Sequence, residues 1–471
     1  MTTGVLLALT GAEEGAVVRA LDAPGTGMRV VRRCADVPEV LAAASAGLGA
    51  VAVLAADLPG VDRTVTARLR AAGVRTLLVA RAQDRDRCAA LGADAVGGAG
   101  AEPATLAAQV IALARAAPGQ PFAVASDVPG NGKPGAHTGS AQPAVPPAAI
   151  PPTEPDVGPG AGSPAGGTGV TGVTGVTGTT GMTGVTGVGD GRLVVVWGAP
   201  GAPGRTTVAV TLAAELARLG TGALLVDADT EAPSVTQVLG LLDDSSAIAV
   251  AARHASHGRL DAATLRRLCP VVDDDLRVLT GLTRADRWRE LPAAALEVVW
   301  ETARRMSSWT VVDVGAGLGD EAGFDPVYGP QRHQAAASAL AAADVVVVVG
   351  AGEPVGMRRL VMALSDLAER AVLRPGAERV VVVTRVRPAA AGPHPARSIL
   401  EALTRFAGVT DAVLVPDDRP ALDKAVLIAS TLTSAAPGSP ARQALQALAA
   451  RLVGEPTAGR RRARPGLARR R

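Results

Sequence analysis

Several residue types suited to binding phosphate lie together in one short turn, GAPGAPGRTT at 198–207. The turn follows an apolar run at 194–196, and a helix-forming run begins at Thr206 and Thr207. The backbone N–H groups of a glycine-rich turn and the positive end of a helix dipole together favour an anion. We therefore predict that the nucleotide-binding residues of this turn are Gly201, Gly204, Arg205, Thr206 and Thr207.

The turn follows the phosphate-binding pattern G-x-x-x-x-G-K-[ST] only in part. In that pattern a lysine reaches the β- and γ-phosphates, and the hydroxyl that follows it holds Mg²⁺. Here Arg205 stands at the lysine position, and Ala199 replaces the first glycine. Lys133 and Lys424 are the only lysines among 47 basic residues, so a coding bias toward arginine also explains Arg205. The turn thus predicts a nucleotide site with altered chemistry.

The turn belongs to a long alternation of strand and helix patterns over residues 191–455. Strands are expected at 194–196, 222–229, 276–282, 309–315, 343–350, 379–385 and 411–418, with helices at 206–219, 234–241, 245–268, 291–306, 356–370, 396–406 and 439–453. This alternation indicates a doubly wound parallel sheet. Asp227 and Asp229 come at the end of the second strand, and Asp313 comes near the end of the fourth.

The order of these segments resembles the ParA/MinD superfamily of P-loop ATPases over nearly all of 191–455. VDAD at 226–229 is similar to the family's first switch segment, and WTVVDVGAG at 309–317 to its Walker B strand and second switch. GAGEPVGMRRLVMAL at 350–364 and VPDDRPALDKAVLIASTL at 415–432 also resemble the family. The resemblance implies a P-loop NTPase fold, ATP and Mg²⁺ as cofactors, and a homodimer that forms on nucleotide binding.

The needs of Mg²⁺–ATP give these residues distinct expected roles. The Thr206 hydroxyl and, through water, Asp313 would hold Mg²⁺, while Arg205 would face the phosphates. Asp229 would orient the attacking water, and Asp227 would support the loop around the nucleotide. Asp229, Asp313 and Arg205 are therefore the candidate catalytic residues. Two simpler alternatives stay open: Asp313 caps the end of a strand, and Thr206 starts a helix, where threonine is favoured.

Two departures from the family pattern predict slow or absent turnover. The planar guanidinium of Arg205 is larger than an ammonium and does not take its place without moving the loop. The family's signature lysine, which reaches across the dimer, corresponds to Pro200, which has neither a charge nor an N–H. Where an arginine finger supplies such a charge, it contributes ~10³–10⁵ in rate. The family's base-reading Asn-Arg pair appears as Thr384 and Arg385, which we include among the candidate nucleotide-binding residues.

Residues 1–116 form a second, shorter alternation. Strands are expected at 5–9, 28–33, 49–57, 76–80 and 95–98, with helices at 13–21, 37–46, 62–72, 84–91 and 103–116. Five strand–helix units of this size predict a flavodoxin-like parallel sheet. GAVAVLAADLPGVD at 49–62 and LGADAVGGAGAEPATLAAQV at 91–110 resemble a response-regulator receiver domain.

The phosphorylation chemistry of a receiver is missing from this segment. Ala55 stands at the position of the phosphate-accepting aspartate, and Thr10 and Gly11 stand at the positions of the acidic pair. Ala99 lies near the position of the lysine, and Ala80 near that of the hydroxyl residue. Asp57 as a shifted acceptor is an alternative, but it lacks the Mg²⁺ ligands and the lysine. We therefore predict a degenerate receiver-like domain at 1–116 that binds protein partners.

Composition assigns different properties to the remaining segments. Residues 117–190 are dominated by Pro, Gly, Ala and Thr, which predicts a disordered linker. The tail at 456–471 carries seven arginines within Arg460–Arg471. Such a cluster can bind an anionic membrane surface, DNA or an acidic partner. The alternative is that it only keeps the chain soluble. Three scattered cysteines and the lack of a signal-peptide pattern predict a cytoplasmic protein, with a peripheral position at the inner face of the membrane as an option.

A receiver-like domain followed by a ParA/MinD-like domain is the arrangement of the CpaE/TadZ family, which positions Flp/Tad pilus assembly machinery. The resemblance implies an ATP-binding protein, either a slow ATPase or a nucleotide-gated scaffold, that positions such an envelope machine. One alternative is a catalytically inactive scaffold that only docks partners, which Ala199, Pro200 and Arg205 favour. Another is a chromosome-partitioning or septum-site-determining ATPase that uses the basic tail.

Overall fold

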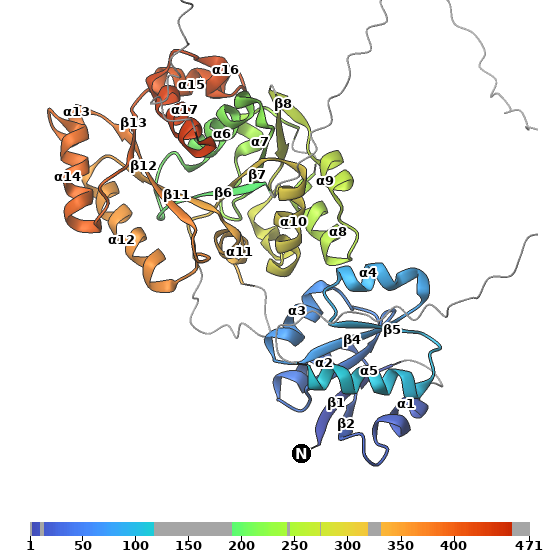
Figure 1. The fold of residues 1–471 in the computed structure, drawn as a ribbon. Helices are drawn as coiled ribbons and strands as arrows, with labels where there is room; N and C mark the ends of the chain where they lie inside the picture. The colour runs from blue at the N-terminus through green and yellow to red at the C-terminus, as the bar shows by residue number, and fades with distance from the viewer. Residues whose placement is uncertain are drawn as a thin grey trace, which may run out of the picture. The chain divides into compact units, whose positions relative to one another are not determined.

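A computed structural model describes residues 2–9, 14–116, 191–242, 245–273, 275–318 and 331–454. These residues form two α/β regions, each built on its own sheet (Figure 1). The predicted linker at 117–190, the basic tail at 456–471 and the pair Thr10 and Gly11 lie outside the described residues. The α/β class with parallel sheets, predicted from the sequence, is confirmed.

The first sheet has five parallel strands in the order β2-β1-β3-β4-β5. The strands are β1 (Thr3–Ala8), β2 (Met28–Arg33), β3 (Val51–Ala55), β4 (Arg75–Ala80) and β5 (Ala95–Gly98). The helices are α1 (Glu14–Leu21), α2 (Val37–Ser45), α3 (Arg63–Ala71), α4 (Arg85–Ala90) and α5 (Pro103–Arg115). This is the strand order of flavodoxin-like sheets, in which the direction of winding reverses between β1 and β3.

Alternate side chains of β1 pack on opposite faces of this sheet. Leu6 belongs to a cluster with Val40 of α2 and Leu69 of α3, whereas Val5 belongs to a cluster with Val110 of α5. Because helices cover both faces, both sets of alternating side chains must be apolar. The uninterrupted apolar runs in this part of the sequence follow from that burial.

The second sheet has eight strands in the order β13-β12-β11-β6-β10-β7-β9-β8. The strands are β6 (Arg192–Trp197), β7 (Ala223–Ala228), β8 (Val271–Asp273), β9 (Leu276–Leu279), β10 (Trp309–Val314), β11 (Val345–Ala351), β12 (Glu378–Val386) and β13 (Val413–Pro416). Among these described strands every neighbouring pair is parallel except β8 and β9. After β6 the chain winds toward β7 and β9, returns through β10 and continues on the other side through β11. The winding therefore reverses around β6, where α/β sheets bind their ligands at the carboxyl ends of the strands.

Helices cover both faces of the second sheet (Figure 1). They are α6 (Arg205–Leu216), α7 (Val235–Val238), α8 (Ala247–Ser256), α9 (Ala262–Leu268), α10 (Ala293–Met306), α11 (Gln334–Ala342), α12 (Pro354–Arg370), α13 (Pro388–Ala391), α14 (Pro395–Ala407), α15 (Arg419–Leu427), α16 (Leu432–Ala435) and α17 (Pro440–Val453). From β6, Val195 and Trp197 pack in the cluster that contains Trp300 of α10, while Val194 and Val196 pack in the cluster of α6 and α17.

Helix α6 is buried on all sides, with every residue from Val208 to Leu216 inside the core. The sheet covers one side, and the C-terminal helix α17 lies beside it on the other (Figure 1, green and red). A buried ion pair joins the two helices: Nε of Arg442 lies 2.7 Å from Oε1 of Glu215, and Nη2 lies 3.2 Å from Oε2. Thr433 donates a further hydrogen bond to Oε1 of Glu215 at 2.7 Å.

The structure refines or differs from the sequence prediction in three places near the second sheet. The helical segment expected at 245–268 consists of two helices, because Gly258 takes φ +66° and Asp261 then caps α9 by accepting from the N–H of Thr264 at 2.6 Å. The helix expected at 234–241 is the single turn α7, which ends before Gly240 at φ +60°. The short edge strand β8 and helices α11, α13, α15 and α16 were not predicted.

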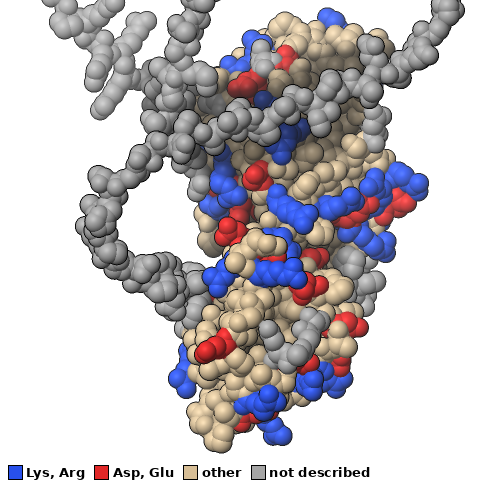
Figure 2. Space-filling view, turned by 90° about the vertical axis from the view of Figure 1, so that its right-hand side faces the viewer, with Lys and Arg blue, Asp and Glu red and all other residues tan. Residues whose placement is uncertain are grey.

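The surface shows no separation of charge on the face drawn in Figure 2, where Lys and Arg side chains are mixed with Asp and Glu. Within the described ranges, none of the helices has both the length and the apolar character needed to cross a bilayer.

Candidate functional site

The predicted phosphate-binding turn lies at the carboxyl end of β6, which has β11 on one side and β10 on the other. The loop spans 198–204, and α6 begins at Arg205, one residue earlier than predicted. Gly201 and Gly204 adopt φ values of +74° and +91°. Other residues take this left-handed conformation only with strain, so these two glycines set the shape of the loop. The first N–H groups of α6 have no partner within the helix and are available to an anion there.

Arg205 is turned toward its own loop and toward Asp229. Its Nη1 donates to the carbonyl oxygen of Gly198 at 3.3 Å, and Nη2 lies 3.6 Å from Oδ2 of Asp229. The Arg205 side chain is 15% exposed. The cation predicted at the phosphate loop is therefore present, but a carbonyl and a carboxylate of the protein already engage it. A phosphate in the loop must share or replace these contacts.

Asp227 and Asp229 organise the segment that follows β7. The Asp227 carboxylate accepts backbone N–H bonds from Asp229 at 3.1 Å, from Ser234 at 3.0 Å and from Val235 at 3.1 Å. Oδ1 of Asp229 accepts from the backbone N–H groups two and three residues further along, at 2.8 and 3.0 Å. Asp227 is thus engaged in supporting the loop at the start of α7, whereas Oδ2 of Asp229 faces Arg205.

Asp313 differs from these two carboxylates because no described residue satisfies it. It lies on β10 in register with Asp227 of β7, and it is 1% exposed. Neither of its oxygens has a hydrogen-bond partner among the described residues. Burial, followed by the nearby Asp227, raises the pKa of Asp313 well above its usual range, and burial raises the pKa of Asp227 to about 7. A strand cap would accept backbone N–H groups, so the bare carboxylate favours a ligand-binding role instead.

Thr206 and Asp313 fit a Mg²⁺ ion. The Thr206 hydroxyl lies on the first turn of α6, 3.3 Å from Oγ of Ser234. It also lies near the Asp313 carboxyl, where it lowers the pKa of that group and offsets part of the rise that burial causes. Mg²⁺ takes oxygen ligands, commonly one or two from the protein and the others from phosphates and water. Among the residues that the structure describes, no three His, Cys, Asp or Glu side chains form a metal centre by themselves. The site therefore suits a Mg²⁺ ion that arrives with a nucleotide.

Thr384 and Arg385 lie near the end of β12, beside a cavity of about 140 Å³ that reaches Thr207. The Thr384 hydroxyl donates to the carbonyl oxygen of Pro203 at 3.0 Å or of Gly350 at 3.1 Å. Arg385 is exposed and takes φ +54°. Thr384 therefore anchors the phosphate loop to β11. Of this pair, Arg385 has the exposed polar side chain that could contact a ligand.

Removing the Thr384 hydroxyl is expected to loosen the phosphate loop. In Thr384→Val the carbonyls of Pro203 and Gly350 lose their donor, which costs about 1–2 kcal/mol of the free energy of unfolding. Thr384→Ser keeps the hydroxyl and serves as the control. Urea unfolding of both variants measures the difference, and equal stability of the two would show that the hydroxyl does not anchor the loop.

Glu231 and His333 belong to the site but were not predicted. The Glu231 carboxylate accepts from the backbone N–H groups of Ala316 at 3.4 Å and Gly317 at 3.3 Å, and Nδ1 of His333 lies 3.2 Å from its Oε1. These contacts join the segment after β7 to the loop after β10. The signal that was available is the position of Glu231, two residues after Asp229. Nothing in the sequence marked His333, because it lies outside the motifs that resemble the family and more than one hundred residues after Glu231.

Arg359 of α12 is a second cation at the loop that the sequence did not reveal. A Cβ on Gly201 would lie 2.5 Å from Nη1 of Arg359, so the guanidinium lies against the middle of the loop. More than 150 residues separate Arg359 from Gly201 in the chain. Only the position of α12 next to β11 and β6 brings them together.

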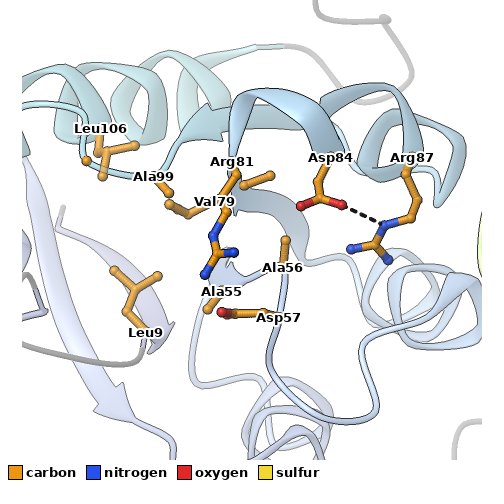
Figure 3. Close-up of a pocket in the computed structure, with 12 residues that line it drawn as sticks. Leu9, Ala55, Ala56, Asp57, Val79, Arg81, Asp84, Arg87, Ala99 and Leu106 are labelled. Carbon is orange, nitrogen blue, oxygen red and sulfur yellow. Dashed lines mark ion pairs between the residues drawn. The ribbon is translucent and has the colours of Figure 1, made fainter. Parts of the chain in front are cut away.

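The first sheet has a larger hollow at the carboxyl ends of its strands, with a volume of about 300 Å³ (Figure 3). Ala55, Ala80 and Ala99 line it where a receiver would carry its acceptor, hydroxyl and lysine. Asp57 and Arg81 also line it, and among the described contacts the ion pair drawn there joins Asp84 to Arg87 and not Asp57 to Arg81 (Figure 3). The lining residues thus offer no nucleophile at position 55, and phosphorylation of Asp57 stays an untested alternative.

No family model and no curated protein matches the sequence. The structure is similar to a ParA family ATPase from Chlorobium tepidum, with 17% identity and a TM-score of 0.47 over 56% of this chain and 98% of the other. It is similar to the septum site-determining protein MinD from Pyrococcus horikoshii, complexed with Mg-ADP, with 18% identity and a TM-score of 0.43 over 55% and 95% of the two chains. A third match is a complex of a Cyanothece McdA variant with ATP, with 14% identity and a TM-score of 0.43 over 56% and 97%. These three likenesses concern the fold of one part of the chain, at identities too low to transfer activities or partners.

Proposed function

We propose that the carboxyl edge of the eight-stranded sheet binds Mg²⁺–ATP and hydrolyses it slowly. The observation that carries this proposal is the bare, buried carboxylate of Asp313 beside Thr206, at the start of a helix that follows a glycine-shaped loop. An anion-binding loop and a Mg²⁺-binding carboxylate are the two parts that phosphoryl transfer requires. The cavity beside Thr207 and Arg385 has room at the other end of the loop for a base.

Protonation of Asp313 gives a direct test. Because burial raises the pKa of Asp313, Mg²⁺ must displace a proton when it binds there. The affinity for Mg²⁺–ATP is therefore expected to rise from pH 6 to pH 8, by up to about tenfold per pH unit for one displaced proton. Isothermal titration calorimetry of the full chain, in two buffers with different ionisation enthalpies, measures both the affinity and the proton release.

Asp313→Asn provides the matched control, because it removes the titrating group and leaves the titration of ATP itself unchanged. The variant is expected to bind Mg²⁺–ATP weakly, with the pH dependence of the nucleotide alone, and to release no phosphate. If the natural chain binds no ATP at millimolar concentration, the nucleotide site is lost and the proposal is wrong. If it binds ATP with the same pH dependence as the variant, Asp313 is not the magnesium ligand.

A second candidate function is a scaffold that binds partners without turnover. The engagement of Arg205 with Asp229 and Gly198 favours it, since this cation is not free for a phosphate. Pro200 favours it as well, because that position supplies no charge across a dimer. Phosphate release measured in the same samples as binding distinguishes the two: binding without Asp313-dependent release supports the scaffold.

The cellular role that we propose is to position an envelope machine of the Flp/Tad pilus assembly type, with ATP as the switch and a homodimer as the ATP-bound form. The sequential order of the two folds motivates this role. Residues 1–116 would bind protein partners, and Arg460–Arg471 would bind an anionic membrane surface or DNA. Deletion of the gene should scatter the pilus assembly components, as seen by fluorescence microscopy, and normal polar placement after deletion would exclude the role.

A further inference from the structure

Arg359 is a cation at the phosphate loop that has no described partner. It is exposed, and the structure gives its guanidinium no hydrogen bond or ion pair among the described residues. An acidic residue at the start of the same helix, Glu353, is paired with Arg387 at 3.3 Å. A guanidinium with five donors and no acceptor nearby is suited to bind an added phosphate.

Arg359 lies close to Gly201 of the phosphate loop. A Cβ built on Gly201 would lie 2.5 Å from Nη1 and 3.4 Å from Cζ of Arg359, so a side chain at this position would have to displace the guanidinium. Gly201 also takes φ +74°, which glycine adopts without strain. Both properties of the position therefore suit the approach of an arginine from α12.

The orientation expected for a bound nucleotide places its terminal phosphate, and not its base, near Arg359. The cavity that has room for a base lies beside Thr207 and Arg385, where α6 begins. Gly201 lies in the middle of the loop and does not line that cavity. A chain of phosphates that starts at the cavity therefore passes Thr207 before it approaches Gly201. The terminal phosphate, which ATP has and ADP lacks, is thus the group that comes closest to Arg359.

The charge of a bound triphosphate also favours a further cation at the loop. Arg205 already contacts Asp229, so part of its charge is offset within the protein. The triphosphate of ATP adds four negative charges, and one Mg²⁺ ion offsets two of them. Another positive charge near the terminal phosphate reduces this excess, and Arg359, with no described partner, is in position to supply it.

We propose that Arg359 binds the terminal phosphate of ATP within its own subunit and thereby makes the site prefer ATP to ADP. This inference rests on the proposed nucleotide site. It differs from charge supplied across a dimer, because the guanidinium lies on the loop of the same chain. Pro200 brings no positive charge to this loop. In this proposal Arg359 of α12 brings that charge instead.

The test compares the dissociation constants of Mg²⁺–ATP and Mg²⁺–ADP for the full chain and for Arg359→Ala, by calorimetry at fixed salt. We expect Arg359→Ala to weaken ATP binding about tenfold and ADP binding less than about twofold, the size of one exposed charge-assisted hydrogen bond. Arg358→Ala is the matched control, because it removes the same charge from the neighbouring exposed position of α12. Arg359→Lys should recover part of the preference for ATP.

Each result separates this inference from the proposed function. If the natural chain binds neither nucleotide, both fail. If it binds ATP but Arg359→Ala keeps the same ratio of ATP to ADP affinity, the nucleotide site stands and this inference is overturned. If Arg359→Ala weakens the binding of ATP and of ADP equally and lowers the unfolding temperature, Arg359 has a packing role. If Arg358→Ala changes the two affinities as much as Arg359→Ala does, the effect is one of general charge.

Discussion

Asp313→Asn is expected to raise the midpoint of thermal unfolding at pH 8 by roughly 2–10 °C in the absence of nucleotide. The Asp313 carboxyl is 1% exposed and has no described hydrogen-bond partner. A buried polar group without a partner costs about 1–3 kcal/mol, and one kcal/mol shifts the midpoint by about 2–4 °C in a domain of this size. A charged group costs more than a neutral one. The amide of asparagine has nearly the same shape and cannot ionise, so the variant avoids the added cost of holding an ionisable carboxyl at this position at pH 8.

The effect should depend on pH in a defined direction. Burial raises the pKa of Asp313 in the folded chain, so the folded chain binds more protons than the unfolded chain above about pH 4. The contribution of this group to stability therefore falls as pH rises from about 4 through the raised pKa. The gain from Asp313→Asn is accordingly smallest near pH 5 and largest near pH 8, which differential scanning calorimetry at several pH values measures.

Mg²⁺–ATP should reverse the order of the two proteins. The ion supplies the missing partner of Asp313, so the natural chain is stabilised and the variant is not. Asp286→Asn is the control, since Asp286 is 63% exposed and pairs with Arg284 at the surface. A variant that is less stable than the natural chain at pH 8 without nucleotide would mean that Asp313 already serves the fold. The same variant should release no phosphate from ATP.

Arg442→Met is expected to lower the free energy of unfolding by about 3–5 kcal/mol, because it leaves the Glu215 carboxylate buried without its cation. Glu215 is 2% exposed, and the pair is held by two hydrogen bonds. In a domain of this size the loss corresponds to a midpoint lower by roughly 6–20 °C. Glu215 lies on α6, the helix that also carries Arg205 and Thr206. Because the substitution loosens this helix, the affinity for nucleotide should fall together with the stability.

Two controls separate burial from charge. Arg451 lies on the same helix and pairs with Asp411 at 2.9 Å, but both side chains are substantially exposed. Arg451→Met should therefore cost less than about 1 kcal/mol. The double variant Glu215→Leu with Arg442→Met removes both buried charges and should recover much of the loss. Guanidinium chloride unfolding measures all three, and equal losses for Arg442→Met and Arg451→Met would contradict the argument.

The central strands of both sheets could be predicted because they are short apolar runs bounded by turn residues. The two edge strands of the first sheet, at 28–33 and 95–98, also have the predicted limits. Two of the failures are short elements whose existence depends on tertiary contacts. Strand β8 forms only because β9 offers it an edge, and α16 is a single turn whose start depends on the Thr431 side chain. Local sequence carries little signal for either.

The candidate site was predictable where its residues follow a strand or precede a helix. Arg205, Thr206, Asp227, Asp229 and Asp313 all do so, and the structure brings them to one edge of the sheet. The state of each side chain was not predictable. Nothing in the sequence distinguishes Asp227, whose carboxylate is fully engaged by backbone N–H groups, from Asp313, whose carboxylate is bare. Arg359 could not be found because the loop that it contacts lies in a distant segment.

The burial of α6 beneath α17 has a consequence for the synthesis of the chain. More than two hundred residues separate Leu216 from Pro440, and a ribosome adds them in about 10–45 s at ~5–20 residues per second. Until then the apolar outer side of α6 and the charged Glu215 have no cover from α17. The nascent chain therefore covers α6 only after α17 has left the ribosome. A chain cut short before Arg442 leaves an exposed apolar surface that chaperones or proteases can recognise.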